Sequence, residues 1–174
     1  MDQSLANRLE TCYSGAVYDV LRKMGLSNQV LPPVIRPLLP ERKLAGPIFT
    51  VKGKVQQGLD PHETLLKWTD MLSKAPVGTV VVCQPNDSIA AYMGELSSET
   101  MHSRGVRGFI TEGGCRDSAF IARLGFPVFC THYTPVDIVG RWVPEELEGL
   151  IEIGGVCIRS GDYVMAGRDG IVII

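Results

Sequence analysis

The sequence has few residues that bind soft metals and none of the spacings that such sites need. Its 174 residues include five cysteines and three histidines, without a C-x-x-C pair or two histidines at H-x-x-x-H spacing. An odd number of scattered cysteines argues against a disulfide framework, and the missing spacings exclude the usual structural zinc sites. Any metal should therefore have oxygen ligands, which favours Mg²⁺, Mn²⁺ or Ca²⁺.

The sequence also lacks an excess of charge, a long apolar run and a nucleotide-binding glycine loop. Its 17 basic and 19 acidic residues give a formal net charge of −2, so no basic footprint for nucleic acid is visible. No run of about 18 apolar residues occurs, and the first residues show no basic segment followed by an apolar one. Neither G-x-G-x-x-G nor G-x-x-x-x-G-K-S/T is present. We therefore expect a cytoplasmic protein without membrane or nucleic-acid partners, which acts on a small molecule or another protein.

Length and apolar content predict one well-filled domain over residues 1–174. The chain is 45% apolar, which is enough for a single core. The first part of the chain favours a helix over residues 14–24, with Val20 and Met24 on its buried side. Apolar and polar residues alternate over residues 49–55, which predicts a strand with one solvent-exposed face and a bulge at Gly53.

The middle of the chain alternates between helix and strand patterns. Residues 60–63 resemble a helix start and residues 76–78 its end, and the buried side of the helix predicted between them includes Leu65 and Leu66. Strands are then expected at residues 79–83, 106–111 and 127–130, with helices at residues 87–103 and 117–124 between them. This β-α-β-α-β order predicts a parallel half-sheet. Turn signals separate short β-like runs in the last third and predict hairpins, so the fold class is α/β with a mixed sheet.

The most informative segment runs from Arg104 to Asp117, where an apolar strand meets paired glycines and then a cation beside a carboxylate. Backbone N–H groups and the positive end of a helix converge at such a junction, so an anion can bind there while Asp117 holds a metal. The pair also follows a predicted parallel strand, at the edge where ligands of open sheets collect. A structural alternative stays open, in which Asp117 is a helix N-cap and Arg116 forms a surface ion pair.

A second candidate motif is Gly94-Glu95-Leu96, inside or at a break in the predicted helix over residues 87–103. Because glycine weakens a helix by about 1 kcal/mol, its presence needs a reason. One reason is that free N–H groups from Gly94 to Leu96 bind a carboxylate while Glu95 carries a proton. The alternative is a kink with a solvated Glu95. Cys115 could act as a nucleophile, but a buried thiol explains it adequately.

Taken together, these motifs resemble one known family. The pattern covers nearly the whole chain and comprises Gly94-Glu95-Leu96, Arg104-Gly105, Gly108, Gly113, Arg116-Asp117, Phe126-Pro127-Val128-Phe129 and Ser160-Gly161-Asp162. It is similar to the family that joins 4-hydroxy-4-methyl-2-oxoglutarate aldolase with the regulator of ribonuclease activity A. The resemblance implies a three-layer β/β/α sandwich, like a swivelling phosphohistidine domain, assembled as a homotrimer or hexamer with sites between subunits.

The resemblance also implies a role for each site residue. Asp117 would contact a divalent metal, Mg²⁺ or Mn²⁺, and Arg116 would bind the 2-oxo acid and stabilise its enolate. The backbone at residues 94–96 would receive the substrate carboxylate, and Glu95 would position a proton-carrying water. Asp19 would reach the site from the neighbouring subunit. These roles predict a metal-dependent lyase that cleaves 4-hydroxy-2-oxo diacids to pyruvate or decarboxylates oxaloacetate.

Two departures from the family pattern leave a second function open. Long aldolase members continue beyond the position of Ile174 and offer another acid to the adjacent site, and Gly167 stands where many relatives have an aspartate. The length of the chain is closer to that of the non-enzymatic regulators. The alternative is therefore a catalytically silent protein that binds and inhibits a ribonuclease or helicase.

Overall fold

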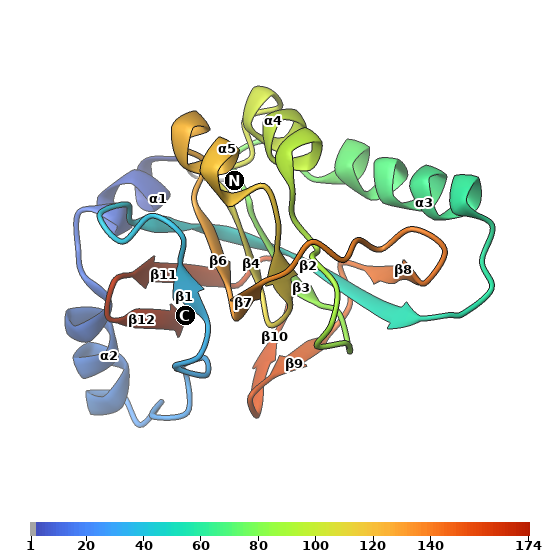
Figure 1. Cartoon of the computed structure of the whole chain (residues 1–174). Coiled ribbons are helices and arrows are strands. Elements are labelled where there is room, and N and C mark those ends of the chain that lie inside the picture. The colour runs from blue at the N-terminus through green and yellow to red at the C-terminus, as the bar shows by residue number, and fades with distance from the viewer. Residues whose placement is uncertain (1–2) are drawn as a thin grey trace.

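The computed structural model describes residues 3–174, in which a mixed sheet carries the helices of residues 61–124 on one face and a second β layer on the other (Figure 1). The helices are α1 Gln3–Glu10, α2 Ser14–Lys23, α3 Pro61–Lys74, α4 Glu95–Ser103 and α5 Ser118–Leu124. The strands are β1 Arg36–Pro37, β2 Leu44–Val55, β3 Val80–Gln84, β4 Gly108–Thr111, β5 Gly114–Cys115, β6 Val128–Cys130, β7 His132–Tyr133, β8 Trp142–Leu147, β9 Ile151–Ile153, β10 Val156–Ile158, β11 Tyr163–Gly167 and β12 Gly170–Ile173. Residues 1 and 2, which belong to the predicted domain, lie outside the described residues.

The parallel half of the sheet consists of β2, β3, β4 and β6, in the spatial order β6-β4-β3-β2. Each neighbouring pair is parallel, and α3, α4 and α5 connect the successive strands. The predicted β-α-β-α-β order is therefore confirmed. β11 and β12 extend the sheet beyond β2 with antiparallel pairing, and the short, proline-containing β1 lies at the other edge. β8, which was not predicted, pairs with β2 across a register shift between Lys52 and Gly53, so the predicted bulge is present.

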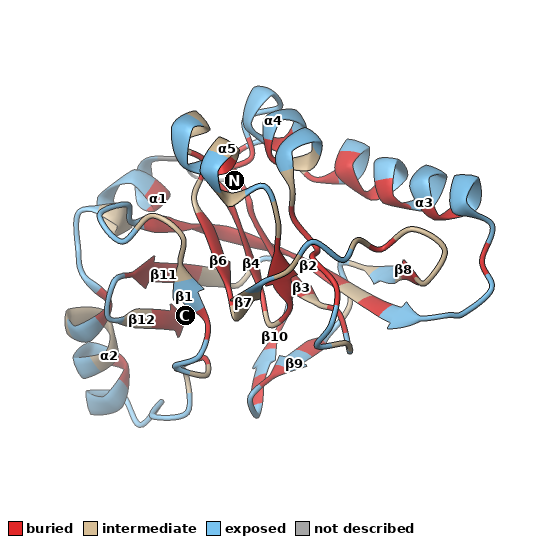
Figure 2. Ribbon diagram, viewed as in Figure 1, coloured by how far each residue is buried: buried red, intermediate tan, exposed pale blue. Residues whose placement is uncertain are grey.

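Alternate residues of the central strands face two separate apolar cores. In β3, Val81 and Cys83 belong to the core under α3, α4 and α5, whereas Val80 and Val82 belong to a core shared with the β9–β10 and β11–β12 hairpins. All four side chains are fully buried, which is why the strand is apolar on both faces. Figure 2 shows this buried band running through the sheet below helices with exposed outer surfaces. The three layers are those of the predicted β/β/α sandwich.

One predicted helix is shorter than expected. The sequence predicts a helix over residues 87–103, but α4 begins only at Glu95. The Asp87 carboxylate accepts hydrogen bonds from the Tyr92 hydroxyl at 2.5 Å and from a backbone N–H three residues further on at 3.0 Å. These bonds compete with helix formation and hold the chain in a turn. Gly94 is the extended N-cap residue of α4, so the glycine marks the start of the helix and not a kink within it.

Four residues predicted to be buried are exposed. On α2 only Leu21 of the apolar stripe is buried, while Val20 and Met24 are 57% and 67% exposed. On α3 the side chains of Leu65 and Leu66 are exposed, although Trp68, Met71 and Leu72 pack in the core. Each helix lies against the sheet along one line, so its core contact is narrower than its apolar stripe. The stripe predicts the inner face correctly and overestimates its width.

The face of β2 that was predicted to be solvent-exposed is also mostly covered. Thr50 was expected on that face, yet its side chain is fully buried and donates a hydrogen bond to the carbonyl of Gly149 at 2.7 Å. Its hydroxyl also lies 2.9 Å from that of Ser160. The later hairpins cover this face, and only the end of β2 is exposed. Within residues 3–174, no helix is long and apolar enough to cross a membrane.

Substituting Gly53 by alanine should strongly destabilise the protein. An added Cβ atom at this bulge would overlap the indole ring of Trp142, which is fully buried against Trp68 and Tyr92. Because the ring is held on both sides, we expect Gly53→Ala to lower the free energy of unfolding by about 1–3 kcal/mol. Urea unfolding followed by circular dichroism measures this change.

Gly15→Ala in α2 is the matched control. Its added methyl group would meet only the Tyr13 ring, at 3.8 Å, and alanine favours the helix. The unfolding midpoint of this variant should equal or exceed that of the wild type. If Gly53→Ala unfolds at the same urea concentration as Gly15→Ala, the expected overlap between the added methyl group and the Trp142 ring does not occur.

Candidate active site

Five of the six predicted site residues lie where three loops meet at the carboxyl ends of the parallel strands. One loop precedes α4, one joins β5 to α5, and the third, residues 134–139, follows β7. Backbone hydrogen bonds connect them: Ala91 N–H to Val136 O at 2.8 Å, Tyr92 N–H to Gly114 O at 2.9 Å, and Arg116 N–H to Met93 O at 2.9 Å. Main-chain groups therefore fix the relative positions of the three loops.

Asp117 has the position of a helix N-cap without the hydrogen bond that defines one. Its backbone is left-handed, with φ 54° and ψ 31°, and its side chain makes no capping bond to the described part of α5. Its Oδ2 atom instead accepts a hydrogen bond from the N–H of Glu95 at 2.9 Å, at the start of α4. Such a conformation costs about 1–3 kcal/mol in a residue other than glycine. This geometry argues against the capping alternative.

Arg116 lies between two carboxylates. Its Nε atom is 3.6 Å from Asp117 Oδ2, and its Nη1 atom is 3.2 Å from Asp137 Oδ2. The three side chains are 39% to 42% exposed, so the guanidinium still presents N–H donors to solvent or a ligand. Asp137 was not predicted as a site residue. The available signal was its place after the last parallel strand, at the same edge of the sheet that carries Arg116.

These residues open onto one cavity of about 500 Å³, a size typical of small-molecule sites. Its lining includes Gly94, Glu95, Leu96, Arg116 and Asp117, so one chain brings together five of the six predicted site residues. A Cβ atom on Gly94 would lie 2.8 Å from Asp117 Oδ2 and would displace it. Glycine at this position therefore allows the carboxylate to approach α4.

Asp19, the sixth predicted residue, lies outside the cavity of its own chain. It is on α2, which packs against β11 and β12 and away from α4 and α5 (Figure 1). Its carboxylate is exposed and pairs with Arg22 at 3.1 Å. A role in the site of a neighbouring subunit stays a prediction.

A buried carboxylate holds the loop before α4. The Asp87 side chain is 6% exposed and pairs with Arg141 at 3.2 Å, besides its bonds to Tyr92 and the Ala90 N–H. Burial alone raises the pKa of Asp87, but these hydrogen bonds and the Arg141 charge outweigh it, so the pKa lies below its ordinary value. Burial and the neighbouring Asp87 raise the pKa of Tyr92, so its hydroxyl stays protonated and donates.

Replacing Asp87 by asparagine should lower the free energy of unfolding by about 1–3 kcal/mol at neutral pH, because Arg141 loses its carboxylate partner. Since the folded-state pKa is depressed, the carboxylate stabilises the fold above its unfolded pKa of about 3.9 and ceases to do so as the pH falls through its folded pKa. The difference between wild type and Asp87→Asn should therefore shrink in that acidic range. Urea unfolding at a series of pH values measures it.

The exposed Asp70, which pairs with Lys74 on α3, offers a control for this substitution. Asp70→Asn should change the unfolding free energy by less than about 0.5 kcal/mol. If Asp87→Asn lowers the free energy of unfolding by the same amount at every pH, down to the lowest, loss of an ionised carboxylate is not the cause of the destabilisation.

Residues 14–173 match the RraA-like family, described as Aldolase/RraA. The chain belongs to this family. The resemblance inferred from the motifs is confirmed. Among the curated relatives of this RraA-like chain, a Halalkalibacterium halodurans protein provisionally named 4-hydroxy-4-methyl-2-oxoglutarate aldolase is 29% identical over 164 residues, which cover 94% of this chain and 71% of that protein. Protein DlpA of Legionella pneumophila is 26% identical over 174 residues, and the match spans 98% of this chain but only 27% of DlpA.

Solved structures share the RraA-like fold. One, described as a novel cellulase from microbes of the gut ecosystem, has a TM-score of 0.92 and 31% identity over 100% of this chain and 78% of its own. Streptomyces coelicolor RraAS2, described as an unusual member of the RNase ES inhibitor RraA protein family, has a TM-score of 0.86 and 25% identity over 100% of this chain and 85% of its own. The predicted mixed α/β fold is confirmed by these neighbours.

The donor set of this RraA-like site suits a hard cation that keeps most of its water. Asp117 supplies carboxylate oxygen, and no cluster of three or more His, Cys, Asp or Glu side chains gathers in the part of the chain that the structure describes. Mg²⁺ commonly binds through one or two carboxylates and several waters. A structural zinc site needs four protein ligands, and the described residues around this cavity do not provide them. The residues present fit the predicted Mg²⁺ or Mn²⁺, for which Asp117 would be the protein ligand.

Cys115 does not have the properties of a nucleophile. It is fully buried, and its hydrogen bond with Cys130, together with burial, raises the pKa of its thiol. A protonated thiol is a weak nucleophile. The structural interpretation of Cys115 therefore holds.

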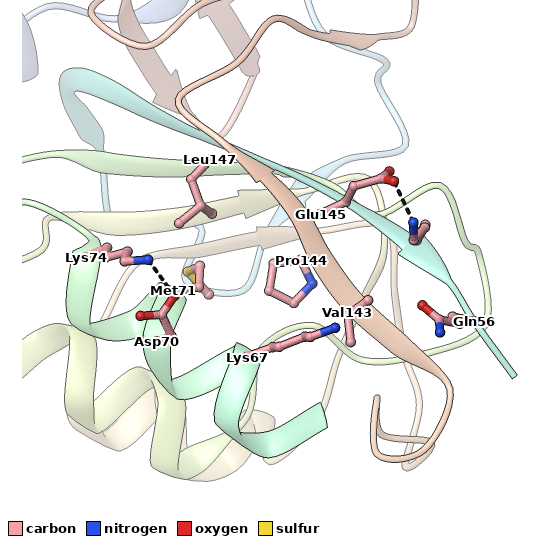
Figure 3. Close-up of a pocket in the computed structure, with 10 residues that line it drawn as sticks. Gln56, Lys67, Asp70, Met71, Lys74, Val143, Pro144, Glu145 and Leu147 are labelled. Atoms are coloured by element: carbon pink, nitrogen blue, oxygen red, sulfur yellow. Dashed lines mark hydrogen bonds and ion pairs between the residues drawn. The ribbon is translucent and has the colours of Figure 1, made fainter. Parts of the chain in front are cut away.

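A separate hollow of about 400 Å³ lies between α3 and β8 (Figure 3). None of the six predicted site residues lines it. Lys54 pairs with Glu145 at 2.6 Å, and Lys74 pairs with Asp70 at 2.7 Å. The hollow therefore carries none of the residues on which the predicted chemistry depends.

Proposed function

We propose that this protein is a divalent-metal-dependent lyase that releases pyruvate from short 2-oxo acids. The reaction is the cleavage of a 4-hydroxy-2-oxo acid, such as the diacid 4-hydroxy-4-methyl-2-oxoglutarate, the decarboxylation of oxaloacetate, or both. The observation that carries the proposal is the convergence of Arg116, Asp117 and Glu95 on one cavity. The provisional aldolase names of curated relatives support it.

Both reactions pass through the enolate of pyruvate. In the cleavage, the bond between C3 and C4 breaks, the 4-hydroxyl group loses its proton and becomes a carbonyl, and the released electron pair forms the enolate. In the decarboxylation, the bond from C3 to the departing carboxylate breaks and carbon dioxide leaves. One proton added at C3 then gives pyruvate, so neither reaction needs an oxidant or a reductant.

Arg116 is suited to binding the 2-oxo acid end of the substrate. Its guanidinium can donate to the carboxylate and to the oxygen that becomes negative in the enolate. The N–H groups of Leu96 and Ser97, in the first turn of α4, lack acceptors within the helix and add the positive end of its dipole. A divalent cation bound by Asp117 would supply Lewis-acid stabilisation of the same negative oxygen.

Glu95 is suited to carrying the proton. Its side chain is exposed and lines the cavity beside Arg116 and Asp117. A carboxyl group at the mouth of a cavity can exchange protons with water and deliver one to C3, directly or through a water molecule.

Pyruvate release tests the proposal and is followed through NADH oxidation by lactate dehydrogenase. With Mg²⁺ or Mn²⁺, the purified protein should release pyruvate from oxaloacetate or 4-hydroxy-4-methyl-2-oxoglutarate faster than metal alone. EDTA should abolish the activity, and excess metal should restore it. Rates equal to the background without protein, for both substrates and both metals, would refute the lyase function for these two diacids.

The second candidate is a non-catalytic protein that binds and inhibits a ribonuclease or helicase. The likeness to RraAS2, from a family described as RNase ES inhibitors, favours it. Titration into a ribonuclease assay should then reduce RNA cleavage, and Asp117→Ala should retain that inhibition. Loss of metal-dependent turnover in a folded Asp117→Ala variant would instead exclude the binding-only function.

We also propose that the protein assembles as a homotrimer or a hexamer of two trimers, with Asp19 near the site of an adjacent subunit. Large apolar residues are exposed on α2 and in the segments beside it: Tyr13, Val20, Met24, Leu26, Val30 and Val34. Burying such surface against another subunit is favourable. Sedimentation equilibrium should give the mass of a trimer or hexamer, and a monomer at micromolar concentration would contradict the assembly.

A further inference from the structure

The cavity beside Arg116 has two sides of different character. The side next to α5 carries the charged groups of Arg116, Asp117 and Asp137. The side next to α3, which lies across α4 from α5 in Figure 1, is lined by apolar side chains. The apolar lining residues from α3 and the loop after β7 are Leu65, Trp68, Leu72, Ile138 and Val139.

The exposure of Leu65 has a simple explanation in this arrangement. Trp68 and Leu72 of α3 are buried in the core and reach the cavity only with their outer atoms, whereas Leu65 is 46% exposed and lines its wall. The indole N–H of Trp68 donates to Ser97 Oγ at 2.9 Å, so the ring presents carbon atoms and no free donor. Thr69, which also lines this side, donates its hydroxyl hydrogen to the carbonyl of Leu65 at 2.9 Å. This wall can therefore make apolar contacts but offers no cation to a negatively charged group.

The charges around the cavity suit a substrate with one carboxylate. Arg116 is the only Lys or Arg among the described residues that line it, and it already lies beside Asp117 and Asp137. Glu95 adds a third carboxylate. Within the part of the site that this chain supplies, one guanidinium and one divalent cation would balance these three charges, so a single substrate carboxylate already makes it negative. A second carboxylate would find no further cation from this chain and would lose water against the apolar wall.

We propose that this site prefers 4-hydroxy-2-oxo acids with one carboxylate and an uncharged, apolar group on C4 over the corresponding diacids. The 2-oxo acid end binds at Arg116 and the start of α4, and the apolar group packs against Leu65, Trp68 and Ile138. The inference rests on the proposed lyase function and narrows its substrate class. Breaking the bond between C3 and C4 then gives pyruvate and an apolar aldehyde, with the same balance of atoms and electrons.

Two substrates of nearly equal shape test the preference. In 4-hydroxy-5-methyl-2-oxohexanoate an isopropyl group replaces the second carboxylate of 4-hydroxy-2-oxoglutarate. We expect kcat/KM for the isopropyl compound to be at least about tenfold higher, because its methyl groups are buried where the carboxylate is left unpaired. Equal values, or a preference for the diacid, would overturn the inference.

A pair of variants on α3 tests whether Leu65 forms the discriminating wall. Leu65→Lys places a cation at the apolar side and should shift the ratio of kcat/KM values toward the diacid by about tenfold or more. Leu66→Lys is the matched control, because Leu66 is 55% exposed on the same helix and is not part of the lining. Its ratio should equal that of the wild type. An unchanged ratio in Leu65→Lys, or equal shifts in both variants, contradicts the assignment of the wall.

Binding without turnover separates this inference from the proposed function. The compounds 5-methyl-2-oxohexanoate and 2-oxoglutarate form a similar pair that lacks the 4-hydroxyl group and cannot undergo the cleavage. In the presence of Mg²⁺, the apolar compound should raise the melting temperature more than the diacid. That result supports the inference even if no substrate releases pyruvate, which would refute only the lyase function. A larger shift with 2-oxoglutarate, or no shift with either compound, overturns the inference.

Discussion

Asparagine in place of Asp117 should reduce metal-dependent pyruvate release by about 10²–10³-fold in kcat/KM. The side-chain amide has nearly the shape of the carboxylate, and its oxygen can still accept the hydrogen bond from the N–H of Glu95. The contact between α4 and α5 should therefore persist. The negative charge that is proposed to hold the cation beside Arg116 is lost. Rates measured over a titration of Mg²⁺ and Mn²⁺ should show this loss at every metal concentration.

Asp70→Asn is the control for this substitution, because it removes a carboxylate from the exposed face of α3, outside the cavity. It should leave kcat/KM within about twofold of the wild type, since surface pairs contribute little. Asp117→Asn should also melt within a few degrees of the wild type. Retained turnover in Asp117→Asn, with metal dependence unchanged, would mean that this carboxylate is not the metal ligand.

Lysine in place of Arg116 should lower kcat/KM by about a hundredfold, although the charge is kept. The guanidinium contacts Asp137 with one nitrogen and faces Asp117 with another, and its remaining N–H groups are available to the substrate. A lysine ammonium group is a compact point charge and cannot donate to Asp137, Asp117 and the substrate in the geometry of the guanidinium. We expect a fall in kcat together with a rise in KM, since Arg116 is proposed to bind the substrate and stabilise the enolate.

Arg123→Lys is the corresponding control. Arg123 is exposed on α5, where its guanidinium lies 5.9 Å from the centre of the Phe120 ring. Its replacement should leave both kinetic constants close to those of the wild type. If Arg116→Lys behaves in the same way, the planar donor group of Arg116 is not required, and the proposed stabilisation of the enolate fails.

The parallel half of the fold was predictable because its signals are local. β3 is apolar on both faces, and Gly125 ends α5 in a left-handed conformation, so both can be read within a few residues. The helix expected over residues 87–103 failed for the opposite reason. Asp87 bonds to Arg141, which is 54 positions later, and that contact helps to fix a loop where local pattern alone favours a helix.

The difference between local and long-range signals also decided which site residues could be predicted. Arg116, Asp117 and Gly94 were predicted because each lies in a short motif with an unusual combination of glycine and charge. Asp137 was missed because its own surroundings carry no such motif, and its carboxylate becomes part of the site only through Arg116. Leu65 was expected in the core because periodicity identifies one face of a helix, and it cannot separate the part covered by the sheet from the part that borders a cavity.

The loops around the cavity are joined through main-chain atoms, and this has a consequence for how such a scaffold can diverge. The bonds from Ala91, Tyr92 and Arg116 use N–H groups that almost every amino acid possesses. Residues on the rim can therefore be exchanged without dismantling the frame that presents them. A protein built in this way can acquire a new specificity, or lose catalysis and keep its shape, through a few replacements at the mouth of the cavity.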